Sequence, residues 1–272
     1  MAAGPVRITS AAHRILKLAR ELGGAHGRKK RGLVLLEGLR AVEAAIAAGG
    51  EAVLVTPKIL AGPRGREVVA ACTAHGVPVY EVDEALFRAV SIVEAPQGIA
   101  LLAPPPRAGL AAALGGAFVL VADRIQDPGN LGALFRSARA FGVDAVVTTA
   151  GTVEAANPKA ARAAAGAWPG LPVCEGVAAA PLARELGQGG RRVLVADAGG
   201  ARDFREPLWR GRVALVLGNE GAGADPGFAA AGAIRVRIPL AASVESLNVT
   251  AAAAILLAEA ARQRGGHSGN IR

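Results

Sequence analysis

Short apolar runs alternate with stretches of helical periodicity along most of the chain. In the second half such runs lie near residues 118–122, 145–148, 171–174, 193–196, 213–217 and 234–238. Runs of Val and Leu without polar alternation are typical of strands that are covered on both faces, which favours a largely parallel sheet. Helices are expected at residues 131–141, 158–165, 181–186 and 247–264. The pattern predicts a doubly wound α/β domain.

The first hundred residues show the same alternation in a smaller unit. Strands are expected at residues 33–37, 53–55, 77–82 and 99–102, and helices after Ser10 as N-cap and at residues 39–48, 64–75 and 83–90. Pro104-Pro105-Pro106 is stiff and cannot continue a strand, so we place a boundary there. The expected division is a small α/β domain at residues 1–104, a linker at 105–116 and a second domain at 117–272, with a loose polar tail at 263–272.

The strand expected at residues 118–122 leads into a polar turn and a helix. Asp127-Pro128-Gly129-Asn130 is typical of a turn, with Asn130 as a plausible N-cap. At about 100° per residue, Arg136 lies off the apolar face of the helix and Arg139 lies at its edge; that face is formed by Leu131, Leu134, Phe135, Ala138 and Phe141. An arginine turned away from the core near such a turn is either an ordinary surface residue or part of an anion or ligand site.

Two later stretches, together with this one, resemble the SpoU (TrmH) family of RNA ribose 2′-O-methyltransferases. The first resembles the family motif N-x-G-x-x-x-R through Asn130, Gly132 and Arg136. The second, at residues 218–221, reads G-N-E-G and follows an apolar run. The third, at residues 238–250, is similar to I-P-M-x-G-x-x-x-S-L-N-V-S, with Leu240, Ala242 and Thr250 in place of Met, Gly and the final Ser. Agreement of three spaced motifs makes the resemblance specific, although Ala242 adds a methyl group near the expected ligand.

The resemblance implies features of the fold that the hydrophobic pattern alone cannot indicate. It implies the SPOUT class, in which a small N-terminal RNA-binding domain precedes a C-terminal, largely parallel α/β domain whose last segment forms a deep trefoil knot. Knots are nearly absent from other proteins, so no spacing of residues could have indicated one. The resemblance also implies a homodimer through the C-terminal domain. The nearly all-apolar helix expected from Leu247 agrees with this, because it has more apolar face than one side of a sheet needs.

The resemblance further implies S-adenosylmethionine as the methyl donor. The residues expected to bind it are Leu217, Gly218, Asn219, Gly221, Ile238, Leu240, Ser246 and Leu247. The candidate catalytic residues are Arg136, Asn130, Glu220, Ser246 and Asn248. Because a guanidinium rarely gives up a proton, we expect Arg136 to hold the target phosphate or to stabilise the developing alkoxide rather than to act as a base.

Supporting roles are expected for the other candidates. Asn130 can fix the turn, and Glu220 can orient Arg136 through a charge-assisted hydrogen bond. The plain alternatives are that Glu220 is a solvated turn carboxylate and that Asn248 is a helix cap.

The net charge of +9 suits an anionic partner such as RNA, although a composition rich in Ala, Gly and Arg would also produce it. The run from Arg28 to Arg31 is more informative, because a basic loop adds affinity by releasing counterions from phosphates. The candidate RNA-binding residues are Arg28, Lys29, Lys30, Arg31, Arg40, Arg124 and Arg139. Ribosomal RNA, of the large (23S) subunit, is the first expectation for the substrate and transfer RNA the second.

Other classes of protein are disfavoured. The sequence has no G-x-G-x-x-G or P-loop, which argues against a nucleotide-dependent oxidoreductase. Two isolated cysteines and four scattered histidines make a metal site unexpected. No signal peptide and no uninterrupted apolar run of about 18 residues is visible, so no membrane association is expected and the cytoplasm is the expected compartment. A non-catalytic RNA-binding protein on the same fold remains the alternative to an enzyme.

Overall fold

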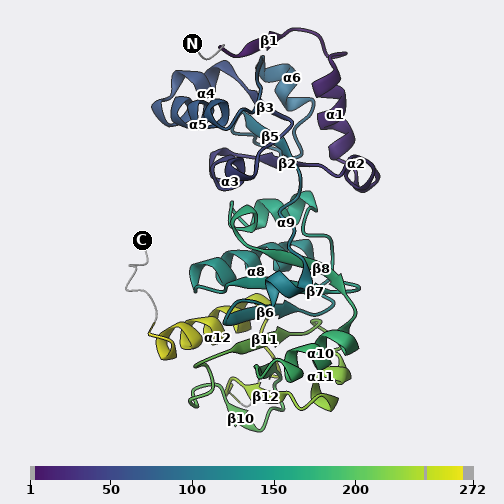
Figure 1. Ribbon diagram of the computed structural model, residues 1–272, viewed down its shortest axis with the longest axis vertical. Coiled ribbons are helices and arrows are strands. Elements are labelled where there is room, and N and C mark those ends of the chain that lie inside the picture. The colour runs from purple at the N-terminus through teal and green to yellow at the C-terminus, as the bar shows by residue number, and fades with distance from the viewer. Residues whose placement is uncertain (1–3, 242–243, 266–272) are drawn as a thin grey trace. The chain divides into compact units, whose positions relative to one another are not determined.

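The computed structural model describes residues 4–241 and 244–265 and divides into two compact units (Figure 1). Unit 1 comprises the chain up to Pro106 together with Ala156–Gly170. Unit 2 comprises Arg107–Ala155 and the chain from Leu171 onward. The expected boundary at the proline run agrees with this division. The assignment of residues 156–170 to unit 1 does not follow the expected domains, because that segment lies within the stretch assigned to the second.

Unit 1 is a five-stranded mixed sheet with helices on it. The strands are β1 (Val6–Ile8), β2 (Val34–Glu37), β3 (Ala52–Val55), β4 (Val79–Val82) and β5 (Ile99–Ala103), in the order β1-β4-β3-β5-β2. β5 is antiparallel to β2 and β3, and the other pairings are parallel. The helices are α1 (Arg14–Leu22), α2 (Ala25–Arg31), α3 (Leu39–Ala45), η1 (Ile46–Ala48), α4 (Pro57–Ala61), α5 (Pro63–Ala74), α6 (Glu84–Arg88), α9 (Pro158–Ala163) and η2 (Trp168–Gly170).

The core of unit 1 forms where α1 and α6 pack on this sheet. α1 places Ile15, Leu16, Ala19 and Leu22 on one buried face, as its period of apolar residues requires. These side chains and Phe87 of α6 pack against Leu35, Leu54 and Leu102. The helix begins later than expected, because its N-cap is His13, whose Nδ1 accepts from the Ile15 N–H, and not Ser10.

Unit 2 is a seven-stranded sheet in which every pairing of the described strands is parallel. Its strands are β6 (Phe118–Ala122), β7 (Ala145–Thr149), β8 (Val173–Val177), β9 (Arg192–Ala196), β10 (Arg202–Asp203), β11 (Val213–Leu217) and β12 (Ile234–Arg237), in the order β10-β12-β9-β11-β6-β7-β8. Its helices are α7 (Leu110–Ala113), α8 (Pro128–Ala140), α10 (Ala179–Gln188), α11 (Pro226–Ala230) and α12 (Val249–Gln263). The largely parallel sheet predicted from the apolar runs is confirmed.

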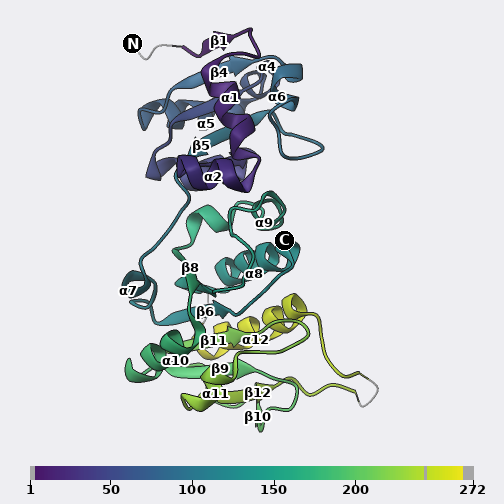
Figure 2. The same cartoon turned by 90° about the vertical axis from the view of Figure 1, so that its right-hand side faces the viewer.

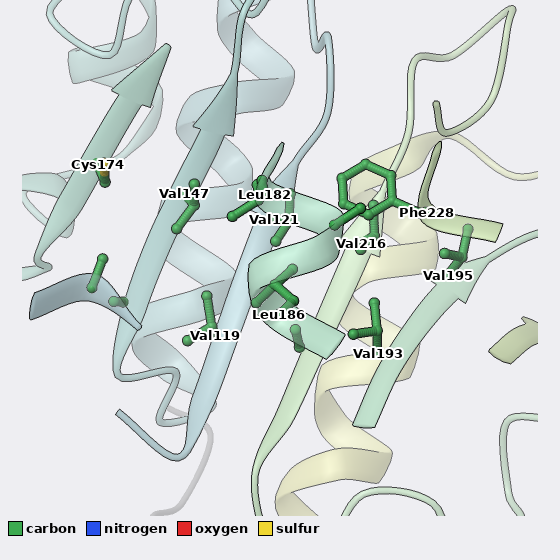
Figure 3. Close-up of a cluster of buried hydrophobic side chains, with 14 residues drawn as sticks. Val119, Val121, Val147, Cys174, Leu182, Leu186, Val193, Val195, Val216 and Phe228 are labelled. Atoms are coloured by element: carbon green, nitrogen blue, oxygen red, sulfur yellow. The ribbon is translucent and has the colours of Figure 1, made fainter. Parts of the chain in front are cut away.

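Both faces of this sheet are covered, which explains why its strands lack polar alternation. On one face, Leu182 and Leu186 of α10 and Phe228 of α11 pack on valines of the strands, as Figure 3 shows. On the other face α8 and α12 pack against each other and cover the sheet (Figure 2). The helix face predicted for α8 is confirmed for Leu131, Leu134, Phe135 and Ala138, which are fully buried while Arg136 is exposed. Phe141, the fifth residue of that face, is the C-cap of the helix and is half-buried.

Some sequence predictions differ from the structure. The linker expected at residues 105–116 contains the helix α7. The helix α12 continues to Gln263, the first residue of the expected tail, and residues 266–272 of that tail lie outside the described residues. Ala242 of the third motif also lies outside them. The trefoil knot stays a prediction.

Candidate functional site

A pocket of about 350 Å³ lies in unit 2 at the carboxyl ends of β9, β11 and β12. This is the edge at which open parallel sheets hold their ligands. Its walls combine the apolar side chains of Leu217, Ile238 and Leu247 with main chain from the ends of the strands. Seven of the eight residues expected to bind the cofactor line it, and these are Leu217, Gly218, Asn219, Ile238, Leu240, Ser246 and Leu247.

The eighth, Gly221, does not line the pocket. Its N–H donates instead to Oδ1 of Asn219, as does the N–H of Ala222, each at 3.0 Å. The main chains of Asn219 and Gly223 also hydrogen-bond to each other in both directions. Gly221 therefore belongs to a tight turn that Asn219 organises from within.

Gly218 is required by the close approach of this turn to the strand end. A Cβ at Gly218 would lie 2.1 Å from the backbone nitrogen of Ala224 and 2.3 Å from the carbonyl carbon of Gly223. Neither backbone atom can move away cheaply, because both belong to the turn. A side chain at this position would push the turn off β11 and change the shape of the pocket.

The buried carboxylate of Asp123 holds the same turn from the other side. Asp123 follows β6 and is fully buried. One carboxylate oxygen accepts from Thr149 Oγ1 at 2.6 Å, and the other accepts from the Asp225 N–H at 2.7 Å and from Arg124 Nη2 at 3.2 Å. A buried carboxylate is tolerated only with such partners. Asp123 thereby ties the ends of β6 and β7 to the loop after β11.

Arg124, which was expected to bind RNA, belongs to the same hydrogen-bond network as Asp123. Its Nη2 also donates to the carbonyl oxygen of Gly223 at 3.1 Å, and its own carbonyl oxygen accepts from Asn219 Nδ2 at 3.0 Å. The backbone of Arg124 has φ of 54°, an uncommon conformation for a residue with a side chain. The guanidinium is therefore engaged in shaping the pocket, which the sequence did not indicate.

Three of the candidate catalytic residues meet at the rim of the pocket. Asn130 Nδ2 donates to Glu220 Oε1 at 2.7 Å, and Asn248 Nδ2 donates to Asn130 Oδ1 at 3.4 Å. Asn130 is free to do this because Asp127, not Asn130, caps α8 by accepting from the Asn130 N–H. Asn248 also caps α12 through Oδ1, so the structural role considered for it and the contact with the site coexist.

Arg136 stands apart from this cluster. It projects from the exposed side of α8, two turns after Asp127. Within residues 4–241 and 244–265 it makes no hydrogen bond or ion pair, so the expectation that Glu220 orients it is wrong for this chain taken alone: Glu220 is bonded to Asn130. Ser246 lines the pocket.

Sequence reasoning missed one polar residue of the pocket. Asp197 follows β9 and lines the pocket together with its neighbours Ala196 and Ala198. Its Oδ2 accepts from Arg235 Nε at 2.7 Å, and this guanidinium lowers the pKa of the Asp197 carboxyl. The available signal was its place at the end of an apolar run, where ligands bind in parallel sheets.

The basic segment at residues 28–31 is a helix, α2, and not the loop that was expected. Arg28 is buried, and its Nη1 donates to the carbonyl oxygens of Leu22 and Gly23 at the end of α1. Its candidacy for RNA binding is therefore contradicted by the structure. Arg31 pairs with Glu21 at 2.7 Å, while Lys29 and Lys30 are exposed. Arg40 on α3 and Arg139 on α8 are also exposed.

In the described part of the chain, no group of three or more His, Cys, Asp or Glu side chains could hold a metal ion. Within the same residues, no helix is long and apolar enough to cross a membrane. Burial raises the pKa of the Cys72 thiol to about 11, so this cysteine is an inert core residue.

Comparisons with known proteins agree with this geometry. The model of the SpoU rRNA Methylase family matches residues 117–258, and the model of the MRM3-like substrate binding domain matches residues 14–101. A Bacillus subtilis protein named 23S rRNA (guanosine(2553)-2′-O)-methyltransferase RlmP is 34% identical over 251 residues, which cover 92% of this chain and 97% of that protein.

Solved structures give the same result. The crystal structure of an rRNA methyltransferase from Sinorhizobium meliloti has a TM-score of 0.81 and 27% identity, covering 95% of this chain and 98% of that one. An AdoMet-bound structure of an rRNA methyltransferase from the same organism has a TM-score of 0.79 and 26% identity, covering 94% and 97%.

Proposed function

The chain belongs to the SpoU rRNA methylase family, and on that premise we propose that it methylates a ribose 2′-hydroxyl of RNA with S-adenosylmethionine as donor. The observation that carries the proposal is the link from Asn130 to Glu220 and Asn248, which joins the three family motifs at the rim of one pocket. Large-subunit ribosomal RNA is the proposed substrate, because the Bacillus subtilis relative is named for 23S rRNA.

The pocket in unit 2 fits the donor. Its volume of about 350 Å³ lies within the range of small-ligand sites, about 300 to 1,000 Å³. Leu217, Ile238 and Leu247 offer apolar surface for the faces of a purine, and backbone groups at the strand ends offer hydrogen bonds for its edge. When bound, S-adenosylmethionine supplies an electrophilic methyl group on a positively charged sulfur. The absence of a side chain at Gly218 keeps the turn at residues 218–225 close enough to β11 to shape this space.

The chain's own residues then position the acceptor. Methyl transfer to the 2′-oxygen requires that the oxygen be aligned and that its proton be removed. We assign to Arg136 the binding of the target phosphate or of the developing alkoxide, because its guanidinium is exposed and has no ion-pair partner in the described residues. Asn130, Glu220, Ser246 and Asn248 shape the rim against which the ribose lies.

We also propose a homodimer through unit 2. Among the described residues, four large apolar side chains are exposed, and three of them, Leu240, Val244 and Ile255, lie at residues 240–255. Ile255 shares one side of α12 with the exposed Ala251 and Ala258, at spacings of four and three residues. A run of exposed apolar side chains along one side of a helix is expected to be covered in solution. Because ribosomes and ribosomal RNA occupy the cytoplasm, we place the protein there.

Methyl transfer to defined RNAs tests the activity and the substrate together. The purified protein is incubated with radiolabelled S-adenosylmethionine and with transcripts of large-subunit ribosomal RNA or with transfer RNA, and the modified position is mapped by its resistance to alkaline cleavage. Label in the ribosomal transcript at an alkali-resistant position is expected. Label only in transfer RNA would favour the second substrate class, and no donor binding by calorimetry would favour a non-catalytic RNA-binding protein.

A further inference from the structure

A second pocket, of about 510 Å³, lies entirely within unit 1. One wall is formed by the end of β2 and the start of α3, and another by the loop at residues 92–97 that precedes β5. The third wall is formed by residues 158–169, which in sequence lie between β7 and β8 of the other unit. Neither the motifs nor the methyl transfer accounts for a pocket at this place.

The segment at residues 158–169 that forms the third wall packs closely on α3. Gly166 has φ of 83°, and a Cβ there would lie 3.0 Å from both the carbonyl carbon and the Cβ of Arg40. The residue before it, Ala165, also has a positive φ, of 50°, which is unfavourable for a residue with a side chain. Backbone strain of this kind persists where the surrounding structure imposes it. The segment is therefore held against Arg40 by packing, and the pocket between them is preformed.

Hydrogen bonds fix the remaining walls. Glu37 Oε1 accepts from the Ile92 N–H at 2.6 Å, and Oε2 accepts from Ser91 Oγ at 2.7 Å. Gln97 Oε1 accepts from the Leu39 N–H at 3.0 Å. Both carboxylate oxygens of Glu37 are thus occupied by the protein, and they anchor the loop that lines the pocket.

The charged side chains of the pocket that remain free to contact a ligand are positive. The pocket is lined by three arginines, of which Arg64 makes two hydrogen bonds to the carboxylate of Glu43, at 2.7 and 3.3 Å. Arg40 and Arg162 are exposed and, in the described part of the chain, make no hydrogen bond or ion pair. Two free guanidinium groups on two walls of one pocket suit a phosphate, which accepts paired hydrogen bonds from arginine.

The interior of the pocket is apolar and partly aromatic. Trp168 is 1% exposed, and its Nε1 has no hydrogen-bond partner in the described residues. The apolar lining also includes Leu39, Ile92 and Pro169. The pocket thus combines an apolar lining with free arginines, the two features with which proteins hold the base and the phosphate of an unpaired nucleotide.

We propose that this pocket holds one unstacked nucleotide of the RNA substrate, with Arg40 and Arg162 on its phosphate. The proposal rests on the proposed function, since it takes RNA as the substrate, and it adds that the RNA must present an unpaired nucleotide to unit 1. Fully paired RNA cannot fill the pocket, because its bases stay stacked.

The test compares two double variants of the full chain that remove equal charge. Arg40→Gln with Arg162→Gln removes the two free arginines of the pocket, and Arg14→Gln with Arg88→Gln removes two exposed arginines of unit 1 that do not line it. The probes are a short single-stranded oligoribonucleotide of mixed sequence, its duplex and a nucleoside 5′-monophosphate. Binding is followed by ¹⁹F NMR of protein labelled with 5-fluorotryptophan, which reports separately on Trp168 and Trp209, assigned with the Trp168→Phe variant.

The single strand is expected to shift the Trp168 signal and to bind the pocket variant at least about tenfold more weakly than the control variant. The slope of log affinity against log salt should fall by about 0.7 for each phosphate that an arginine no longer neutralises. The monophosphate should shift the same signal more weakly, and the duplex should leave it unchanged. Equal affinity of the two double variants, or a Trp168 signal unmoved by saturating single strand, would overturn the proposal. Methyl transfer measured on the same samples separates this outcome from failure of the proposed function, because a chain without transferase activity can still show the shift.

Discussion

The side-chain amide of Asn130 donates a 2.7 Å hydrogen bond to Oε1 of Glu220, a residue 90 positions later in the chain. The other end of the same amide accepts from Asn248 Nδ2 at 3.4 Å. Asn130 therefore links the helix after β6, the turn after β11 and the loop before α12. A single short side chain with both a donor and an acceptor can do this, whereas Asp in its place would turn a carboxylate toward Glu220.

The link predicts that Asn130 and Glu220 act as one unit. Asn130→Ala and Glu220→Ala should each lower methyl transfer by about tenfold or more, since a hydrogen bond to a charged group contributes on the order of 1.5 to 3 kcal/mol. The double variant should be little worse than the more damaged single variant, because both remove the same bond. Methyl incorporation at saturating donor measures this, with Asp83→Ala, which removes the cap of α6 in unit 1, as control. Losses that simply multiply would show that the two residues act independently.

Asp123 is predicted to stabilise both the fold and the donor pocket. Asp123→Ala leaves the Asp225 N–H, Thr149 Oγ1 and the Arg124 guanidinium without their acceptor in a buried place. We expect a loss of about 3 kcal/mol or more in the free energy of unfolding, measured in urea, and weaker donor binding. Asp127→Ala, which removes only a helix cap, should cost about 1 kcal/mol. Equal losses in the free energy of unfolding for Asp123→Ala and Asp127→Ala would contradict the role assigned to the buried carboxylate.

The basic residues of α2 are predicted to have two different roles: the exposed lysines contact RNA, and the buried arginine stabilises the fold. Lys29→Ala with Lys30→Ala should weaken RNA binding and flatten its salt dependence without changing the melting temperature, because both side chains are exposed. Arg28→Ala should instead lower stability by about 1 to 3 kcal/mol, because it strips two carbonyl oxygens at the end of α1 of their donor. Lys17→Ala with Lys58→Ala is the control of matched charge. RNA affinities that do not differ between the two lysine pairs would remove α2 from the RNA surface.

The sequence predicted those parts of the molecule that local patterns determine. Most strands of unit 2 were predicted to within a residue or two, because runs such as Phe118–Ala122 are buried on both faces. The exceptions are β8, expected at 171–174 and found at Val173–Val177, and the two-residue strand β10, which was not predicted. Short helices such as α7 and α11 were missed, because four or five residues carry no period. Seven of the eight residues expected to bind the donor line one pocket, because the motifs lie in the loops around it. That this pocket binds the donor stays a proposal.

Contacts that depend on how one element is placed against another were beyond prediction, whether the residues lie close together or far apart in sequence. Arg28 looks like any basic surface residue until the end of α1 is placed beside it. Arg124 looks like an RNA ligand until the carbonyl of Gly223, 99 residues later, is placed beside it. The place of Gly166 against Arg40 likewise required the fold, since nothing local separates it from other glycines of the chain.

The buried carboxyl of Glu37 predicts a dependence of stability on pH. Burial raises its pKa above the ordinary value, against the lowering effect of hydrogen bonds from Ile92 and Ser91. The folded chain therefore holds this proton more tightly than the unfolded chain does, and the resulting stability is present below the ordinary pKa and lost as pH rises through the raised value. Glu37→Gln cannot ionise, so wild type should lose stability relative to this variant as pH rises from the ordinary carboxyl pKa toward neutrality. Parallel curves of melting temperature against pH would contradict this.

The proposed mechanism depends on Arg136 acting on the reacting ribose or its phosphate, and the variant that probes this is Arg136→Ala. The side chain is exposed and makes no hydrogen bond or ion pair within the described residues, so the variant should keep its stability within about 0.5 kcal/mol. Donor binding should also survive, since Arg136 does not line the donor pocket. Arg136→Lys should rescue little, because lysine lacks the planar, two-pronged geometry.

The decisive measurement is methyl incorporation into the ribosomal RNA transcript at saturating donor, with donor affinity and melting temperature recorded for each variant. We expect Arg136→Ala to lower transfer by on the order of a hundredfold or more, as loss of one donor to a transition state does, while the other two quantities stay unchanged. Transfer by Arg136→Ala close to that of the wild type would contradict the proposed mechanism and remove Arg136 from the site.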